Sequence, residues 1–135
     1  MKYPGEVFKL IVAGAGALIN YLFGGWNQVL QILLFFVVLD YITGVIAGAI
    51  EKKLSSAVGA KGIAKKTLIF IVVAVAHQLD IVIGKGSVLM DMASFFYLAN
   101  ELLSIFENVG RSGLPLPDQL KQAVEVLKGK IEKGA

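Results

Sequence analysis

The chain of 135 residues contains no cysteine, a single histidine and few charged side chains. The absence of cysteine excludes disulfide bonds, zinc sites built on thiolates and catalysis by a thiol. There is also no serine nucleophile motif and no second histidine to act as a base. We therefore predict a protein that is not an enzyme and that requires no metal or cofactor.

Charge is scarce because hydrophobic residues dominate the sequence. They make up 56% of the chain and charged residues only 17%, compared with about 45–50% and about 25% in soluble domains. The net charge is only +3, and the cations are concentrated in a few segments rather than along one face. This composition predicts an all-α integral membrane protein and argues against nucleic acid as a partner.

Four apolar segments are predicted to form helices, at about residues 7–23, 29–50, 67–83 and 88–106. As a helix, the segment 29–50 is about 33 Å long, which matches a hydrocarbon core of about 30 Å. The first segment contains Lys9, Asn20 and the small-residue run "AGAGA". It either crosses the membrane or lies in the interface. We expect three to four transmembrane helices in a membrane domain of residues 1–108.

The distribution of lysine predicts the orientation of these helices. Residues 51–66 form a predicted loop with a basic cluster of Lys52, Lys53, Lys61, Lys65 and Lys66. By the positive-inside rule this loop is cytoplasmic, and the basic C-terminus falls on the same side. Residues 109–135 are predicted to form a connector and a cytoplasmic amphipathic helix. Its apolar face would consist of Leu120, Val124, Leu127 and Ile131.

The segment "LLFFVVLDYITGVIAGAI" places one carboxylate, Asp40, among uncharged residues. An acid at this depth costs roughly 2.5–3.5 kcal/mol, so it is expected to face protein or water rather than lipid. Helical steps of four lead from Asp40 to Gly44 and Gly48, with Ala47 alongside. Such small residues permit close helix packing. We predict that this face packs within one bundle, between copies of the chain, or both.

The last apolar segment carries polar residues at steps of three and four along one side. They are Asp91, Ser94, Tyr97, Glu101, Ser104 and Asn108. This stripe either joins helices together or lines a water-filled lumen. His77 and Asp80 lie one turn apart near the end of the preceding segment. They are predicted to be intramembrane polar partners, through a mutual hydrogen bond or a carboxylate that reaches the interface.

Four motifs occur in order: "LDYITGVIAGAI", "LSSAVGAKGIAKK", "HQLD" and "YLANELLSIFENVGRSGLPLP". Together they resemble the phage holin family that includes clostridial toxin-release holins, over roughly residues 24–127. The family pattern falls on Asp40, Thr43, Gly44, Ser55, Gly59, Lys61, Gly62, Lys66, Asp80, Glu101, Ser104, Glu107, Asn108, Gly113, Pro115 and Pro117. The resemblance implies a multi-pass protein of the bacterial cytoplasmic membrane that self-associates and opens lesions. An endolysin, or in some relatives a toxin, leaves the cell through them.

Two other functions remain open from the residues alone. The membrane carboxylates would also suit a small ion channel or a proton-coupled exporter. A membrane scaffold could instead use the C-terminal helix to recruit a cytoplasmic protein. For the holin interpretation, the expected partners are other copies of the chain and the lipid bilayer. The endolysin or toxin is then a released cargo that need not bind directly.

Overall fold

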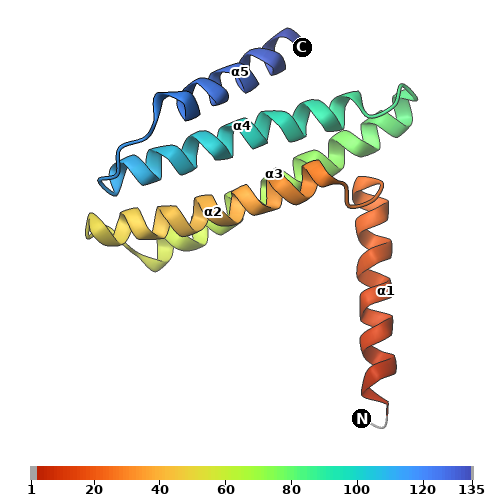
Figure 1. Ribbon diagram of the computed structural model, residues 1–135. Helices are drawn as coiled ribbons and strands as arrows, with labels where there is room; N and C mark the ends of the chain where they lie inside the picture. Colours follow the sequence, from red (N-terminus) through yellow and green to blue (C-terminus); the bar gives the residue numbers. More distant parts are fainter. Residues whose placement is uncertain (1–2, 135) are drawn as a thin grey trace.

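The structure is a computed structural model that describes residues 3–134, except for the side chains of Val124, Leu127, Lys128 and residues 130–134. The described residues form helices and no strands (Figure 1). The helices are α1 (Pro4–Phe23), α2 (Gln28–Ile50), α3 (Ser56–Ile83), α4 (Val88–Arg111) and α5 (Asp118–Gly134). The first four are long and apolar enough to cross a membrane, which confirms the predicted all-α membrane architecture.

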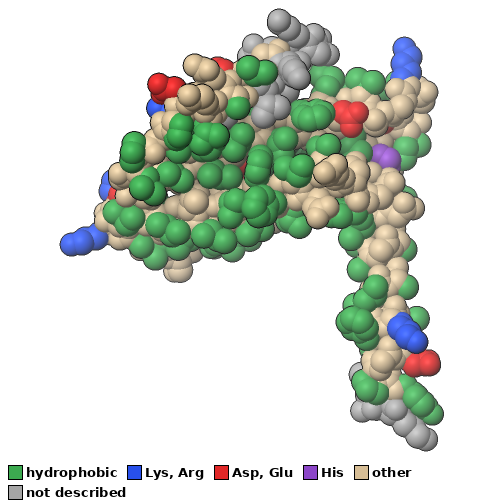
Figure 2. All heavy atoms as spheres, viewed as in Figure 1, with side chains coloured by type: hydrophobic (Ala, Val, Ile, Leu, Met, Phe, Trp, Pro, Cys, Tyr) green, Lys and Arg blue, Asp and Glu red, His purple; other side chains and the backbone are tan. Residues whose placement is uncertain are grey.

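Helices α2, α3 and α4 form a bundle in which α3 runs antiparallel to α2 and α4 (Figure 1). Its largest fully buried side chains are Leu30, Leu33 and Val73, and Leu30 and Leu33 lie near the start of α2. In the view of Figure 2, hydrophobic side chains cover much of the visible bundle surface, and charged ones lie mainly at its edges and ends. Such an exterior is compatible with lipid.

The bundle has two chemically different ends. We call the end formed by the end of α2, the start of α3 and the end of α4 the basic end, because it carries Lys52, Lys53, Lys61 and Arg111. The other end, where α2 and α4 begin and α3 ends, carries Trp26 and Lys85. We call it the opposite end.

The predicted start of the third helix at residue 67 is wrong, because α3 begins at Ser56. The hydroxyl of Ser55 caps the helix by accepting a hydrogen bond from the amide of Val58, at 3.2 Å. Alanine and lysine, which are frequent in this segment, are good helix formers, so the loss of apolar periodicity did not mark a loop.

The predicted basic loop is therefore mostly helical. Lys61, Lys65 and Lys66 lie on α3, and only Lys52 and Lys53 remain in the link. Lys52 has a left-handed backbone conformation (φ 57°), and the amide of Lys53 donates to the carbonyl of Gly48 at 2.9 Å. This pattern closes the end of α2.

The fourth helix also extends beyond its predicted end at residue 106, to Arg111. Gly113 then turns the chain with φ 97°, and Pro115 and Pro117 separate α4 from α5. Helix α5 lies beside α4 (Figure 1). The predicted apolar residues Val124, Leu127 and Ile131 lie outside the described side chains, and Leu120 is exposed.

Helix α1 projects steeply away from the bundle and contacts it only near its end (Figure 1). Phe23 is its one buried residue among those described. The side chain of Gln78 on α3 donates to the carbonyl of Tyr21 at 2.8 Å. At Gly24, which has φ 75°, the backbone lies against the ring of His77.

We expect Gly24→Ala to weaken the attachment of α1 to the bundle. The new Cβ would lie 2.7 Å from Cε1 of His77, and the left-handed conformation alone costs a non-glycine residue about 1–2 kcal/mol. Thermal unfolding in detergent should show the loss. Gly14→Ala is the control, since its Cβ would meet no atom within 4 Å. Equal stability of the two variants would contradict this account.

Candidate functional site

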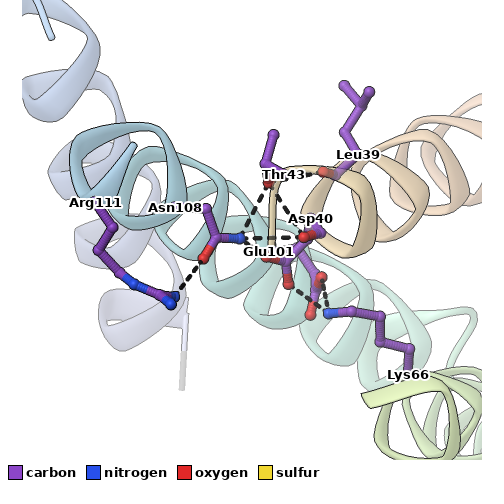
Figure 3. Close-up of polar contacts among 7 residues, drawn as sticks. All are labelled: Leu39, Asp40, Thr43, Lys66, Glu101, Asn108 and Arg111. Carbon is purple, nitrogen blue, oxygen red and sulfur yellow. Dashed lines mark hydrogen bonds and ion pairs between the residues drawn. The ribbon is translucent and has the colours of Figure 1, made fainter. Parts of the chain in front are cut away.

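A buried ion cluster joins the three helices of the bundle (Figure 3). Asp40 from α2 and Glu101 from α4 face Lys66 from α3. The ammonium of Lys66 donates to Oδ2 of Asp40, and to Oε2 of Glu101 at 3.0 Å. Asp40 is 7% exposed and Glu101 4%, and the Lys66 side chain is 18% exposed. The cluster therefore shelters two carboxylates and one ammonium from lipid.

Asn108 extends this cluster toward the basic end. Its Nδ2 donates to Oδ1 of Asp40 at 2.8 Å and to the hydroxyl of Thr43 at 3.0 Å. Thr43 in turn donates to the carbonyl of Leu39 at 2.8 Å. Both oxygens of the Asp40 carboxylate are thus occupied, one by Lys66 and one by Asn108. Asp40 is the central acceptor of the network, as Figure 3 shows.

An ion pair at the basic end completes the network. Nη1 of Arg111 donates to Oδ1 of Asn108 at 3.2 Å, and Nε donates to Oε1 of Glu51 at 3.0 Å. The hydrogen bond from Arg111 lowers the pKa of Glu51 below its ordinary value. The pair therefore contributes stability above that ordinary pKa, and loses it as the pH falls through the lowered value.

The buried polar atoms of the cluster each have at least one hydrogen-bond partner. In the part of the chain that the structure describes, every buried side-chain nitrogen or oxygen has a partner. The same residues contain no group of three His, Asp or Glu side chains placed to hold a metal ion. Because an uncompensated buried charge is costly, the three ions can persist in lipid only as a set.

The structure brings together part of the predicted stripe on α4. Ser94, Glu101 and Asn108 are buried, and the last two contact the ion cluster. Tyr97 and Ser104 are only partly buried. Asp91 is exposed and accepts a hydrogen bond from the hydroxyl of Ser87 at 2.9 Å, so it lies outside the cluster.

The predicted small-residue face of α2 packs inside the bundle. Ala47 is fully buried, and a Cβ at Gly44 would lie 3.5 Å from Nδ2 of Asn108. Gly48 is also buried, and a Cβ at this position would lie 3.5 Å from Cδ1 of Leu54. The missing side chains let α4 and the link approach α2 closely.

His77 and Asp80 have separate partners in the described structure. The carboxylate of Asp80 accepts hydrogen bonds from the amides of Leu89 at 2.9 Å and Met90 at 2.8 Å. It therefore caps the start of α4 from the end of α3. His77 lies against Gly24 instead. Of the two predicted alternatives, the mutual hydrogen bond is not among the described contacts, and Asp80 is buried as a helix cap.

The inward position of Lys66 was not predicted, because the sequence pattern indicates a cytoplasmic loop at this lysine. On α3, helical geometry turns Lys66 toward α2 and α4. A signal was available: two carboxylates predicted to lie inside the membrane require a cation nearby, and Lys66 is the lysine next to the apolar part of α3. Arg111 lies within the predicted connector, and its contacts with Glu51 and Asn108 were not predicted.

These features define a class: a multi-pass helical membrane protein with an apolar exterior and an ionic core. The sequence pattern of the bacteriophage holin family matches residues 17–129. The chain therefore belongs to the bacteriophage holin family. This membership supports a holin role and a non-enzymatic protein of the inner membrane.

Individual relatives agree with this assignment. The chain is 36% identical over 108 residues to a probable holin of Bacillus phage phi105, covering 80% of this chain and 79% of the relative. It is 44% identical over 132 residues to an uncharacterized protein of Halalkalibacterium halodurans, covering 94% and 98%. An uncharacterized protein of Clostridium perfringens is 42% identical over 120 residues, covering 88% and 91%. No solved structure matches the chain.

Proposed function

We propose that this protein self-associates in the bacterial cytoplasmic membrane and permeabilises it to release an endolysin or a toxin. The observation that carries the proposal is the ion cluster of Asp40, Lys66 and Glu101 inside a bundle with a lipid-compatible exterior. A protein that only had to remain in the membrane would not need three buried ions, since well-packed apolar residues are often at least as stabilising.

The ions of the cluster can be satisfied in two arrangements of the same helices. In the closed bundle, the ions satisfy one another. If α4 separates from α2 and α3, Glu101 and Asp40 must find water, because lipid cannot solvate them. Water is available where several copies surround a lumen. The choice between a closed bundle and a wet assembly is therefore a two-state switch, and the open state requires other copies of the chain.

The charge distribution supports an orientation with the basic end in the cytoplasm. The three bundle helices then cross the membrane, and the C-terminus is cytoplasmic. Helix α1 carries Glu6, Lys9, Ala13, Gly16 and Asn20 at steps of three and four, so one side is polar or small. With its steep angle to the bundle (Figure 1), this pattern favours a helix that lies along the outer membrane surface.

The test is to induce the protein in bacteria with and without a cytoplasmic muralytic enzyme. We expect an abrupt stop of growth in both cultures and lysis only when the enzyme is present, because folded protein must cross the membrane to reach the wall. Optical density and release of a cytoplasmic reporter enzyme measure the two effects.

An ion channel or a proton-coupled exporter would depolarise the membrane or move small solutes without releasing the reporter enzyme. Depolarisation without release of folded protein would therefore overturn the proposal. Normal growth at high membrane accumulation would overturn both functions.

A further inference from the structure

A groove with a volume of about 400 Å³ leads from the basic end to the ion cluster. Asp40 and Lys66 lie at its inner end, and Gly44, Gly48 and Gly62 contribute to its walls. Lys53 lines it from the link between α2 and α3. The charged core of the bundle is therefore open toward one end.

The groove lies where α2 and α3 are not closely packed against each other. Helix α2 packs mainly on α4 and only sparsely on α3. A Cβ at Gly44 or at Gly48 would meet its nearest neighbour at an ordinary contact distance of 3.5 Å. Toward the opposite end, the fully buried Leu30, Leu33 and Val73 fill the bundle. Beyond Lys66, the space between α2 and α3 is lined mostly by apolar side chains, so the polar part of the groove ends at this lysine.

The polar inner end indicates what occupies the groove. An ammonium has three N–H donors, and the described hydrogen bonds of Lys66 use two of them, to Asp40 and Glu101. A lipid tail in the groove would place hydrocarbon against the remaining donor and against a carboxylate, which is unfavourable. Water can hydrogen bond to both.

We propose that the groove is a vestibule that fills with water from the basic end and brings water and small hydrophilic solutes to Lys66 and Asp40 in the closed bundle. The assignment of this end to the cytoplasm rests on the proposed function, but the vestibule itself does not. The ion cluster is then hydrated from one side of the membrane and insulated from the other. It can exchange protons and small ions with that side only.

The absence of cysteine allows a direct test with single cysteines in the full-length chain. Gly44→Cys and Gly48→Cys place a thiol in the groove. Ile46→Cys is the control matched in depth, because Ile46 lies between them on α2 and is 48% exposed on the bundle surface. Lys53→Cys reports which side the basic end faces. A membrane-impermeant thiol reagent is applied from each side to vesicles that retain an encapsulated dye.

We expect the groove cysteines to react from the same side as Lys53→Cys and from that side alone. Ile46→Cys should react at least about 100-fold more slowly, because a thiol forms the reactive thiolate only where water reaches it. If these glycine variants do not fold, Gly62→Cys samples the groove from α3, where a Cβ would meet the ring of Tyr41 at an ordinary contact distance of 3.8 Å. Lysis activity is measured separately for each variant.

Three results would overturn the vestibule. If the groove cysteines react with the reagent as slowly as Ile46→Cys does, while Lys53→Cys reacts fully, then the groove is dry or holds a lipid tail. Reaction from both sides of intact vesicles would mean a continuous pore. Rapid reaction of Ile46→Cys would place this part of α2 outside the membrane, and would overturn the proposed topology as well.

Discussion

Lys66→Met is expected to destabilise the protein by about 3–5 kcal/mol, the usual cost of removing one partner from a buried ion pair. The substitution keeps much of the side-chain volume but leaves the carboxylates of Asp40 and Glu101 without their shared cation. The measurement is unfolding of the detergent-solubilised protein by titration with sodium dodecyl sulfate. The control is Lys65→Met, which removes a neighbouring but exposed lysine from α3.

A triple variant separates the loss of the shared cation from the loss of packing. Adding Asp40→Asn and Glu101→Gln to Lys66→Met removes both orphaned charges while keeping hydrogen-bonding groups at these positions. We expect this variant to recover most of the lost stability. Lys66→Met as stable as Lys65→Met would show that the ion cluster does not hold the bundle together. If the triple variant is no more stable than Lys66→Met, the loss of stability arises from packing.

The sequence could predict the elements that depend on local composition. The segment 29–50 corresponds to α2 within one residue at its start, because an apolar run of this length has few alternatives to a membrane-spanning helix. Asp40 was expected to face protein or water rather than lipid, and it is buried inside the bundle. Both inferences need only the cost of placing polar groups in lipid.

The sequence could not predict contacts that depend on how helices are aligned with one another. Lys66 was assigned to a loop because its neighbours are polar, although the helix continues through them. Its partners Asp40 and Glu101 lie on two other helices. Which residues face one another across a bundle is fixed by packing of side chains on all three helices, and that information is not local.

The position of α1 illustrates a second limit. Its apolar length was compatible with crossing the membrane or lying on it, and length alone does not choose between them. The structure adds the turn at Gly24 and the contact with His77, which direct α1 away from the bundle. The turn residues "GG" were visible in the sequence, but the direction of the turn depends on a histidine from α3.

The second large effect is expected at the opposite end of the bundle, from Asp80→Leu. Asp80 accepts hydrogen bonds from the amides of Leu89 and Met90, and it is 5% exposed. Leucine would leave these two amides without acceptors, at about 1–3 kcal/mol each. The start of α4 would also lose the negative charge that favours a helix N-terminus.

The stability of Asp80→Asn should lie between that of the wild type and that of Asp80→Leu, because the amide oxygen of asparagine can still accept one of the two hydrogen bonds. Asp91→Asn is the matched control: it neutralises an exposed acid in the first turn of the same helix. Hydrogen exchange at Leu89 and Met90, together with detergent unfolding, distinguishes a local from a global loss. If Asp80→Leu unfolds no more readily than Asp91→Asn, then Asp80 does not anchor α4 to α3, and the bundle relies on the ion cluster and the apolar core alone.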